Sequence, residues 1–565
     1  MFHTTLLVCM VGMVSAILPS DRIVVYTKSG PIRGKVVSDT NVHYYSYQGI
    51  PYAESPTGDL RFKPPVPKSP WNKIRNATKE GSICPQSDAK PEEMSEDCLF
   101  INIYVPYIRL GKLSVLVYVH GGEFLSNSGN SDNQYGPQLL LKHGIILVTL
   151  NYRIGALGFL SLGVEDASGN AGIKDVLLAL RWINDNIDRF GGDTSRITLG
   201  GNSAGAVLVH YLLLSAKSSG LFKQAILISG SALGYRFLAR HAKENALALG
   251  KYLDLQTENR QDLLQKLKEI DALEIVKAQK DMGKNDTRKG LRTFAPFVPC
   301  VEIEHKNAVI TKYPKDIIAS GIPQNVPILA GFNSDEGLKM YPAVKKDPTL
   351  IDYLNENVEL LIPSDIEYPY GSNESTNVAT RIREFYFNGT TISKDVTQGY
   401  VDFITDGMFS FAINSWVKLH KQRKDSKNVY YYAFDFEGSL NYNKINNNID
   451  RPGTSHADEL GYLFVTKVTR PYLNNIDKKS ERMVNIWTST VANFVKFGDP
   501  TQILYNLGGI DWLESSSNLN HFRLADLENR NEAPRARFLQ FWSEIYNEYD
   551  EYVRNGGQLM QKIVP

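Results

Sequence analysis

A serine at position 203 lies in a five-residue pattern that suits nucleophilic chemistry. Gly201, Asn202, Ser203, Ala204 and Gly205 follow the pattern G-x-S-x-G, with an apolar strand-like run before it and an apolar helix-like run after it. A sharp strand-to-helix turn of this kind exposes the serine hydroxyl, and the two glycines leave room where backbone segments crowd. The start of the following helix also favours negative charge nearby. The pattern therefore predicts that Ser203 attacks a carbonyl carbon.

A serine hydroxyl needs a base to accept its proton and a carboxylate to orient that base. His456, in a glycine-containing stretch after an apolar run, is the candidate base. His420 lies among basic residues on what we expect to be a solvated helix face, and His521 lies in a polar stretch, so both rank behind it. The candidate acid is Glu336, with its neighbour Asp335 as the rival, because both follow a strand-like run at the edge where open α/β sheets place their sites. The ordinary alternatives are a surface carboxylate and a core histidine.

The negative oxygen that forms when a serine attacks a carbonyl needs preorganised N–H donors. Gly121 and Gly122 follow His120 directly after the apolar run 113–119, and Ala204 begins the helix-like segment after the nucleophile. We expect the backbone N–H groups of Gly121, Gly122 and Ala204 to be these donors, although a Gly-Gly pair after a strand is by itself more often only a turn. Loss of one such donor typically costs about 3 kcal/mol of transition-state stabilisation. No metal ion or cofactor enters this chemistry.

Short apolar runs alternate with helix-like segments along the chain. Continuous apolar runs are what strands need when both faces of a parallel sheet are buried. Five runs of strand length meet this description: 113–119, 145–150, 197–200, 225–228 and 326–330. The segment 174–190 between two of them has apolar residues at helical spacing. The alternation predicts an α/β fold with a large, mostly parallel sheet.

No internal repeat and no linker rich in Pro, Gly and Ser interrupts this alternation. We therefore expect residues 17–565 to form a single domain. The segments 235–290 and 340–425 are expected to be helical insertions above the carboxyl edge of the sheet.

The charge balance points to small-molecule chemistry. The 565 residues include 62 Lys and Arg against 61 Asp and Glu, a net charge of +1. Such a balance provides no strong field to attract nucleic acid or an anionic membrane. No stretch reaches the ~20 apolar residues of a membrane span, so we expect a soluble mature protein whose partner is a small molecule. The sequence does not indicate the oligomeric state.

The amino terminus predicts export from the cell. Residues 1–16 contain an apolar run that ends in Val14, Ser15 and Ala16, which is typical of a secretory signal peptide and its cleavage site. The C-terminal residues KIVP are not a retrieval signal of the KDEL type. Four N-x-S/T triplets in the remaining chain are candidate glycosylation sites: Asn76, Asn285, Asn373 and Asn388. We therefore expect a secreted, extracellular glycoprotein.

Several blocks of the sequence, in order, resemble the type-B carboxylesterase and cholinesterase family of α/β-hydrolases. The resemblance extends over nearly the whole mature chain, in the blocks YQGIPYA (47–53), LRF (60–62), SEDCL (95–99), GNAGIKD (169–175) and FGGD (190–193). It implies an α/β-hydrolase fold and a catalytic triad of Ser203, Glu336 and His456. Glu336 is preferred to Asp335 because the family's acid precedes a glycine, here Gly337.

The same resemblance implies two further features. Ser229 is similar to the family's hydroxyl that lies behind the acid. Cys84 and Cys98 match the family's first disulfide, which leaves Cys300 unpaired as a buried small hydrophobic side chain rather than a reactive thiol.

Two departures narrow the resemblance. Cholinesterases place a Trp inside the first disulfide loop to hold a quaternary ammonium, and the loop 84–98 here contains no aromatic residue, so we expect no activity on choline esters. Asn202 stands where general carboxylesterases commonly have Glu and insect juvenile hormone esterases have Gln. The remaining blocks, such as YRIGALGF (152–159), resemble secreted insect carboxylesterases and juvenile hormone esterase-type enzymes most.

These observations predict a secreted serine hydrolase that cleaves carboxylic esters through an acyl-enzyme. One alternative is an extracellular binding or adhesion protein that keeps the fold without catalysis. The presence of Ser203, Glu336, His456 and the glycine pair together argues against it. A second alternative is a lipase that acts at lipid surfaces. The sequence leaves open the acyl and alcohol specificity, with juvenile hormone, pheromone, dietary and xenobiotic esters as candidate substrates.

Overall fold

The structure is a computed structural model that describes residues 23–87, 89–131, 134–287, 295–502 and 509–559. The expected signal peptide, residues 1–16, and the side chain of Asn285 lie outside this description. Within it, none of the helices combines the length and the apolar character needed to cross a membrane.

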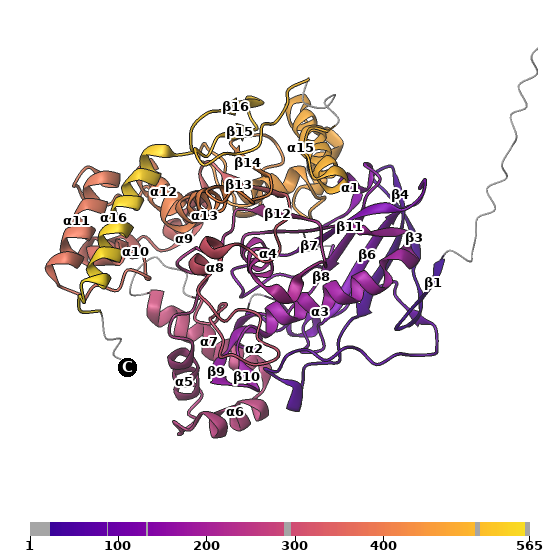
Figure 1. Cartoon of the computed structure of the whole chain (residues 1–565), viewed down its shortest axis with the longest axis horizontal. Helices are drawn as coiled ribbons and strands as arrows, with labels where there is room; N and C mark the ends of the chain where they lie inside the picture. Colours follow the sequence, from indigo (N-terminus) through magenta and orange to yellow (C-terminus); the bar gives the residue numbers. More distant parts are fainter. Residues whose placement is uncertain (1–22, 88, 132–133, 288–294, 503–508, 560–565) are drawn as a thin grey trace, which may run out of the picture.

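A large mixed sheet, eleven strands wide in the described part of the chain, organises the molecule (Figure 1). Neighbouring strands run parallel from β7 and β8 through β15, whereas β3, β4 and β6 at one edge and β16 at the other pair antiparallel. In spatial order the strands are β16 (Glu528–Arg530), β15 (His521–Arg523), β14 (Val429–Phe434), β13 (Ile328–Asn333), β12 (Gln224–Ile228), β11 (Gly192–Asn202), β7 (Leu113–Val119), β8 (Ile146–Leu150), β6 (Phe100–Pro106), β4 (Val42–Pro51) and β3 (Lys35–Asp39).

The central strands are apolar throughout because both faces of the sheet are covered. In β7, Val115 and Val117 belong to one hydrophobic cluster, and Leu116 and Tyr118 belong to a second cluster on the opposite face. The first cluster includes helices α3 (Ala171–Asn186) and α4 (Ala204–Leu214), and the second includes α15 (Lys478–Phe497). All five predicted strand runs are confirmed: the run 113–119 has the same bounds as β7, and the other four have shifted ends. The run 326–330, for example, becomes strand only from Ile328, directly after Pro327, whose nitrogen has no hydrogen to donate to a sheet.

The two predicted insertions are helical. The first contains α5 (Ala242–Tyr252), α6 (Arg260–Glu269) and α7 (Ala272–Thr287), which lie together in the lower part of Figure 1. The second contains α10 (Thr349–Glu356), α11 (Asn373–Phe387), α12 (Gln398–Thr405) and α13 (Phe411–Lys421). Helices α10 to α12 share a third hydrophobic cluster with the C-terminal helix α16 (Ala536–Arg554), at the left of Figure 1.

Shorter elements complete the description: β1 (Val24–Thr27), β2 (Gly30–Arg33), β5 (Arg75–Asn76), β9 (Ser161–Val164), β10 (Ala167–Ser168), α1 (Gln138–Leu141), α2 (Gly155–Phe159), α8 (Pro314–Ser320), α9 (Tyr341–Lys346) and α14 (Tyr442–Asn447).

Candidate active site

Ser203 occupies the turn between strand β11 and helix α4. Its backbone angles are φ 54° and ψ −126°, a conformation that residues with a side chain rarely adopt. The turn is held because the Ser203 N–H donates to the Ile228 carbonyl at 2.7 Å, which ties it to the neighbouring strand β12. A Cβ atom at Gly205 would lie 2.1 Å from the Val119 carbonyl oxygen, so only glycine lets α4 start this close to β7.

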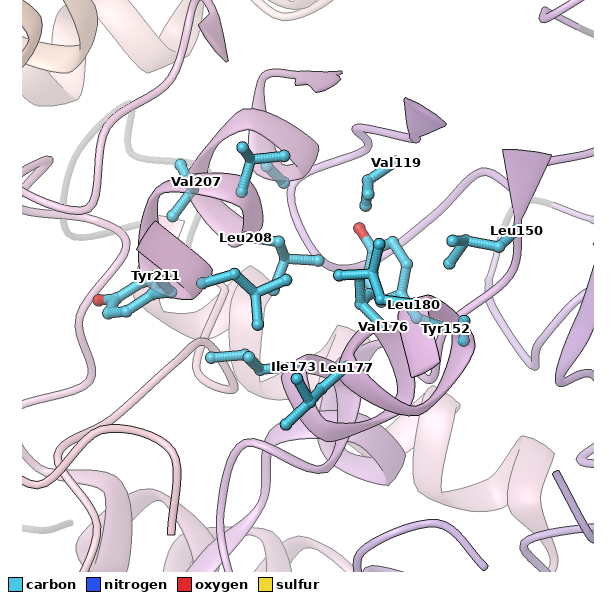
Figure 2. Packing of buried hydrophobic residues seen from close by; sticks show 14 of the residues in the cluster. Val119, Leu150, Tyr152, Ile173, Val176, Leu177, Leu180, Val207, Leu208 and Tyr211 are labelled. Atoms are coloured by element: carbon cyan, nitrogen blue, oxygen red, sulfur yellow. The ribbon is translucent and has the colours of Figure 1, made fainter. Parts of the chain in front are cut away.

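Helix α4 is fixed behind Ser203 by close packing against helix α3. Figure 2 shows the apolar side chains of α4 meeting those of α3, beside the ends of strands β7 and β8. The labelled side chains are Val207, Leu208 and Tyr211 from α4, Ile173, Val176, Leu177 and Leu180 from α3, Val119 and Leu150 from the strand ends, and Tyr152. This packing gives the nucleophile a rigid support.

The structure brings Glu336 and His456 into direct contact. Glu336 begins the 3₁₀ helix Glu336–Met340 after β13, and His456 lies in the loop after β14. The Nδ1 atom of His456 is 2.5 Å from Oε2 of Glu336, which is fully buried. The rival Asp335 instead accepts hydrogen bonds from the Ser334 hydroxyl at 2.6 Å and from Gln398 at 2.9 Å. Among the described residues, His456 contacts the carboxylate of Glu336 and not that of its neighbour Asp335.

Two further donors hold the Glu336 carboxylate. The hydroxyl of Ser229 donates to Oε1 at 2.5 Å, and the backbone N–H of Asn333 donates to the same oxygen at 2.8 Å. Ser229 follows β12 and Glu336 follows β13, so the parallel pairing of these strands places the two side chains together. These two donors orient the carboxylate so that its second oxygen faces His456. The sequence analysis predicted a role for Ser229 but not for Asn333.

An aromatic ring covers His456 on another side. The ring centroids of Phe409 and His456 are 4.7 Å apart. Phe409 lies in the π-helical turn Asp406–Ser410, and such turns are frequent at functional sites. Nothing in the sequence around Phe409 indicates this contact, because it depends on a helix inserted about fifty residues before the histidine.

The glycine turn after β7 approaches the nucleophile closely. A Cβ atom at Gly121 would lie 3.0 Å from Cβ of Ser203 and 2.7 Å from the Asn202 carbonyl oxygen, so a side chain there would collide with the nucleophile's turn. Gly122 follows in the same turn, and Ala204 is the first residue of α4, where helix N–H groups have no partner within the helix. Gly121 therefore lies against the turn of Ser203, and Gly122 and Ala204 directly follow Gly121 and Ser203 in the chain.

Buried groups brace this turn from behind. His120 stacks on Tyr152 at 4.4 Å, and the Tyr152 hydroxyl donates to the His120 carbonyl at 3.0 Å. Burial lowers the pKa of His120 to about 4, so its imidazole is neutral near pH 7. The Asn202 side chain, directly before Ser203, is held as well: its Oδ1 accepts hydrogen bonds from the hydroxyls of Tyr118 at 3.3 Å and Tyr135 at 3.2 Å.

A second buried carboxyl lies near the acid. Glu459 is fully buried, and burial, followed by the charge of Glu336, raises its pKa well above the usual range. Its Oε2 accepts a hydrogen bond from the Asn333 side chain, while its Oε1 has no hydrogen-bond partner among the described residues. The raised pKa of Glu459 favours the neutral form of its carboxyl group. The sequence analysis did not identify Glu459 as a residue near the site.

The expectation that His420 lies on a solvated face was wrong. His420 is 1% exposed and its ring lies 6.2 Å from that of Trp416, because the two residues are four apart and share the buried face of α13. Lys418, two residues earlier, is exposed. His521 is also mostly buried, and its Nδ1 is 2.8 Å from the Glu532 carbonyl oxygen. Among the described residues, neither His420 nor His521 forms a hydrogen bond or an ion pair with a candidate site residue.

The cysteine predictions are confirmed. Cys84 and Cys98 form a disulfide with Cα atoms 5.0 Å apart, and Cys300 is the free cysteine of the described chain, buried with its pKa raised to about 12 by burial. A thiol of that kind is unreactive near neutral pH. Three of the candidate glycosylation asparagines, Asn76, Asn373 and Asn388, are exposed.

A hollow of about 230 Å³ adjoins the glycine turn through Glu123. Apolar side chains from three parts of the chain contribute to its wall, together with Gln86 from the disulfide loop and Gln279 from α7. The apolar side chains are Leu125, Ile154, Leu157, Ile275 and Val276.

The chain is similar to known carboxylesterases over most of its length. The model of the carboxylesterase family matches residues 21–542. The juvenile hormone esterase of Heliothis virescens is 33% identical over 500 residues, which cover 85% of this chain and 86% of that protein. Venom carboxylesterase-6 of Apis mellifera is 33% identical over 492 residues, which cover 84% and 86%. A crystal structure of juvenile hormone esterase from Manduca sexta, with OTFP covalently attached, superposes with a TM-score of 0.82 at 30% identity and covers 93% of this chain and 99% of that one.

Proposed function

Because the chain belongs to the carboxylesterase family and is a carboxylic ester hydrolase, we propose that it is a secreted serine esterase that forms an acyl-enzyme. The observation that carries the proposal is the 2.5 Å contact between His456 and the buried Glu336, at the same sheet edge as the strained turn of Ser203. A buried carboxylate that fixes the imidazole and stabilises its protonated form is what general-base activation of a serine requires.

In the proposed first half of the reaction, Oγ of Ser203 attacks the ester carbonyl carbon while Nε2 of His456 takes the hydroxyl proton. The carbonyl oxygen becomes an oxyanion held by the N–H groups of Gly121, Gly122 and Ala204. The carbon–oxygen bond to the alcohol then breaks, and the leaving alkoxide takes the proton from His456. The acyl group remains on Ser203.

In the second half, water attacks the acyl carbon and gives its proton to His456. The bond to Ser203 breaks, the serine recovers the proton, and the carboxylic acid leaves. In both halves the Glu336 side chain, 2.5 Å from Nδ1 of His456, stabilises the imidazolium that forms. No cofactor takes part in either half.

The proposed substrate is a small apolar ester. The disulfide loop has no aromatic side chain to hold a quaternary ammonium, and the hollow beside the glycine turn is lined mainly by aliphatic side chains. Relatives in this family are named juvenile hormone esterases, so juvenile hormone is one ester to compare with p-nitrophenyl acetate and p-nitrophenyl butyrate.

The function is tested on the full chain expressed with its own amino terminus. We expect turnover of p-nitrophenyl butyrate, loss of that turnover in Ser203→Ala, and kcat/KM that falls as the pH is lowered because a protonated His456 accepts no proton. A folded wild-type protein without turnover, or a pH profile without an acidic limb, would remove the proposed mechanism and favour a non-catalytic binding protein.

Secretion is tested in the same expression. We expect the protein in the medium, with Ile17 as its first residue, and a loss of mass on treatment with an N-glycosidase because exposed Asn76, Asn373 and Asn388 receive glycans. Retention inside the cell with Met1 in place would contradict this part of the proposal.

A further inference from the structure

An ion pair connects the glycine turn to the helix that begins with Glu336. The Lys339 ammonium contacts the Glu123 carboxylate. Glu123 directly follows Gly122, and Lys339 lies three residues after Glu336 in the 3₁₀ helix Glu336–Met340. The side chains of Glu123 and Lys339 are only 25% and 14% exposed, so water screens this pair far less than it screens a surface pair.

Lys339 also reaches the surroundings of the base. Its ammonium lies 5.7 Å from the centre of the Phe409 ring, within the range of a cation–π interaction. The same ring packs on His456 at 4.7 Å. A continuous series of contacts therefore runs from Glu123 through Lys339 and Phe409 to His456.

The backbone at the turn needs support of this kind. Glu123 and Phe124 have φ values of 57° and 63°, the left-handed region that non-glycine residues seldom occupy and keep only where their surroundings hold them. Phe124 is held by burial of its ring beside Phe159 and Phe237. Glu123 is only partly buried, and its carboxylate is paired with the Lys339 ammonium.

We propose that Glu123 and Lys339 are positioning residues for ester hydrolysis, because their ion pair sets the glycine turn at a fixed place relative to Glu336 and His456. The inference rests on the proposed function, in which the turn supplies the oxyanion donors. Donors of this kind act on charge that develops only in the transition state, so a small displacement of the turn lowers kcat and leaves substrate binding nearly unchanged.

The test is a double-mutant cycle of Glu123→Gln, Lys339→Met and the combined variant, assayed with p-nitrophenyl butyrate. We expect each single variant to lower kcat at least tenfold with KM within twofold of the wild type. We expect the combined variant to be no worse than the poorer single variant, because neither charge is then left without its partner. The binding of a trifluoromethyl ketone, which forms a tetrahedral adduct with a catalytic serine, should weaken by the same factor as kcat/KM.

Two controls separate positioning from general stability. Lys315 and Asp550 form an exposed ion pair outside the candidate site residues, and Lys315→Met should leave kcat unchanged. Thermal unfolding of each Glu123 and Lys339 variant shows whether it folds, and the combined Glu123→Lys, Lys339→Glu variant, which keeps opposite charges at the two positions, should recover part of the lost kcat.

The outcomes distinguish this inference from the proposed function. Wild-type turnover that persists in Ser203→Ala would overturn the proposed function itself. Turnover that depends on Ser203 but is unchanged in Glu123→Gln and Lys339→Met would overturn only the positioning role. Losses that multiply in the combined variant, or that appear in KM alone, would equally overturn it.

Discussion

Replacement of Glu336 by Gln changes the acid that orients His456 while keeping its shape. The carboxylate accepts three hydrogen bonds, from His456 at 2.5 Å, the Ser229 hydroxyl at 2.5 Å and the Asn333 N–H at 2.8 Å. The glutamine amide has one acceptor oxygen and one NH₂ group. Because two donors meet Oε1, the amide oxygen takes that side and its NH₂ faces Nδ1 of His456.

This arrangement reverses the tautomer of the imidazole. An Nδ1 that accepts a hydrogen bond from the amide leaves the proton on Nε2, the atom that must accept the Ser203 proton. The corresponding carboxylate-to-amide change in a serine protease triad lowers kcat about 10⁴-fold. At about 1.4 kcal/mol per tenfold change, the expected loss here is about 5 kcal/mol of transition-state stabilisation.

The assay is kcat for p-nitrophenyl acetate, with Asp335→Asn as the matched control. Asp335 is the adjacent acid, but its carboxylate accepts hydrogen bonds from Ser334, Gln398 and the Thr454 N–H rather than from His456, so Asp335→Asn should keep kcat within about threefold. A Glu336→Gln enzyme with more than a tenth of wild-type kcat would refute this reasoning. An equal loss in Asp335→Asn would refute the assignment of the acid.

Three further predictions concern the surroundings of the site. Ser229→Ala removes a hydrogen bond to a buried charge, a loss of about 1.5–3 kcal/mol, so kcat/KM should fall roughly 10- to 100-fold, and an unchanged value would show that the hydroxyl is dispensable. Cys84→Ser with Cys98→Ser opens the loop and should lower the free energy of unfolding in urea by about 3 kcal/mol, which an unchanged midpoint would contradict. Burial raises the pKa of Glu459, so its contribution to stability is complete below its unfolded pKa of 4.5 and is lost as the pH rises through its folded pKa. Glu459→Gln should therefore gain stability relative to the wild type as the pH rises above 4.5, by up to about 1.4 kcal/mol per pH unit in thermal unfolding, and a difference independent of pH would be evidence against the raised pKa.

The strands and the turn of Ser203 were predictable because they depend on local sequence. Continuous apolar runs mark strands that are buried on both faces, and the G-x-S-x-G pattern marks a turn that only small residues permit. The edge strands β3, β4 and β16 carry mixed polar and apolar residues, so they have no comparable local pattern.

The choice between neighbouring side chains was harder to predict. Asp335 and Glu336 follow the same strand, and their spacing does not say which one turns inward; the resemblance to a family favoured Glu336, and the contact with His456 agrees with that choice. His420 was misplaced because its basic neighbours in sequence hid the helical spacing that joins it to Trp416 on a buried face.

Contacts between distant segments could not be predicted at all. Lys339 and Glu123 are 216 residues apart, and Phe409 reaches His456 from an inserted helix. No local pattern records such a pair, because it forms only when the sheet has brought the loops to one edge.

The most direct test of the account is to trap the acyl-enzyme. The full chain is mixed with excess p-nitrophenyl acetate, quenched in acid within milliseconds to seconds, and its peptides are mapped by mass spectrometry. The account predicts a burst of one p-nitrophenolate per chain and one acetyl group, located on Ser203, with neither present in Ser203→Ala. Turnover without a burst and without an acetylated Ser203, or an acetyl group on another residue that turns over at the catalytic rate, would contradict it.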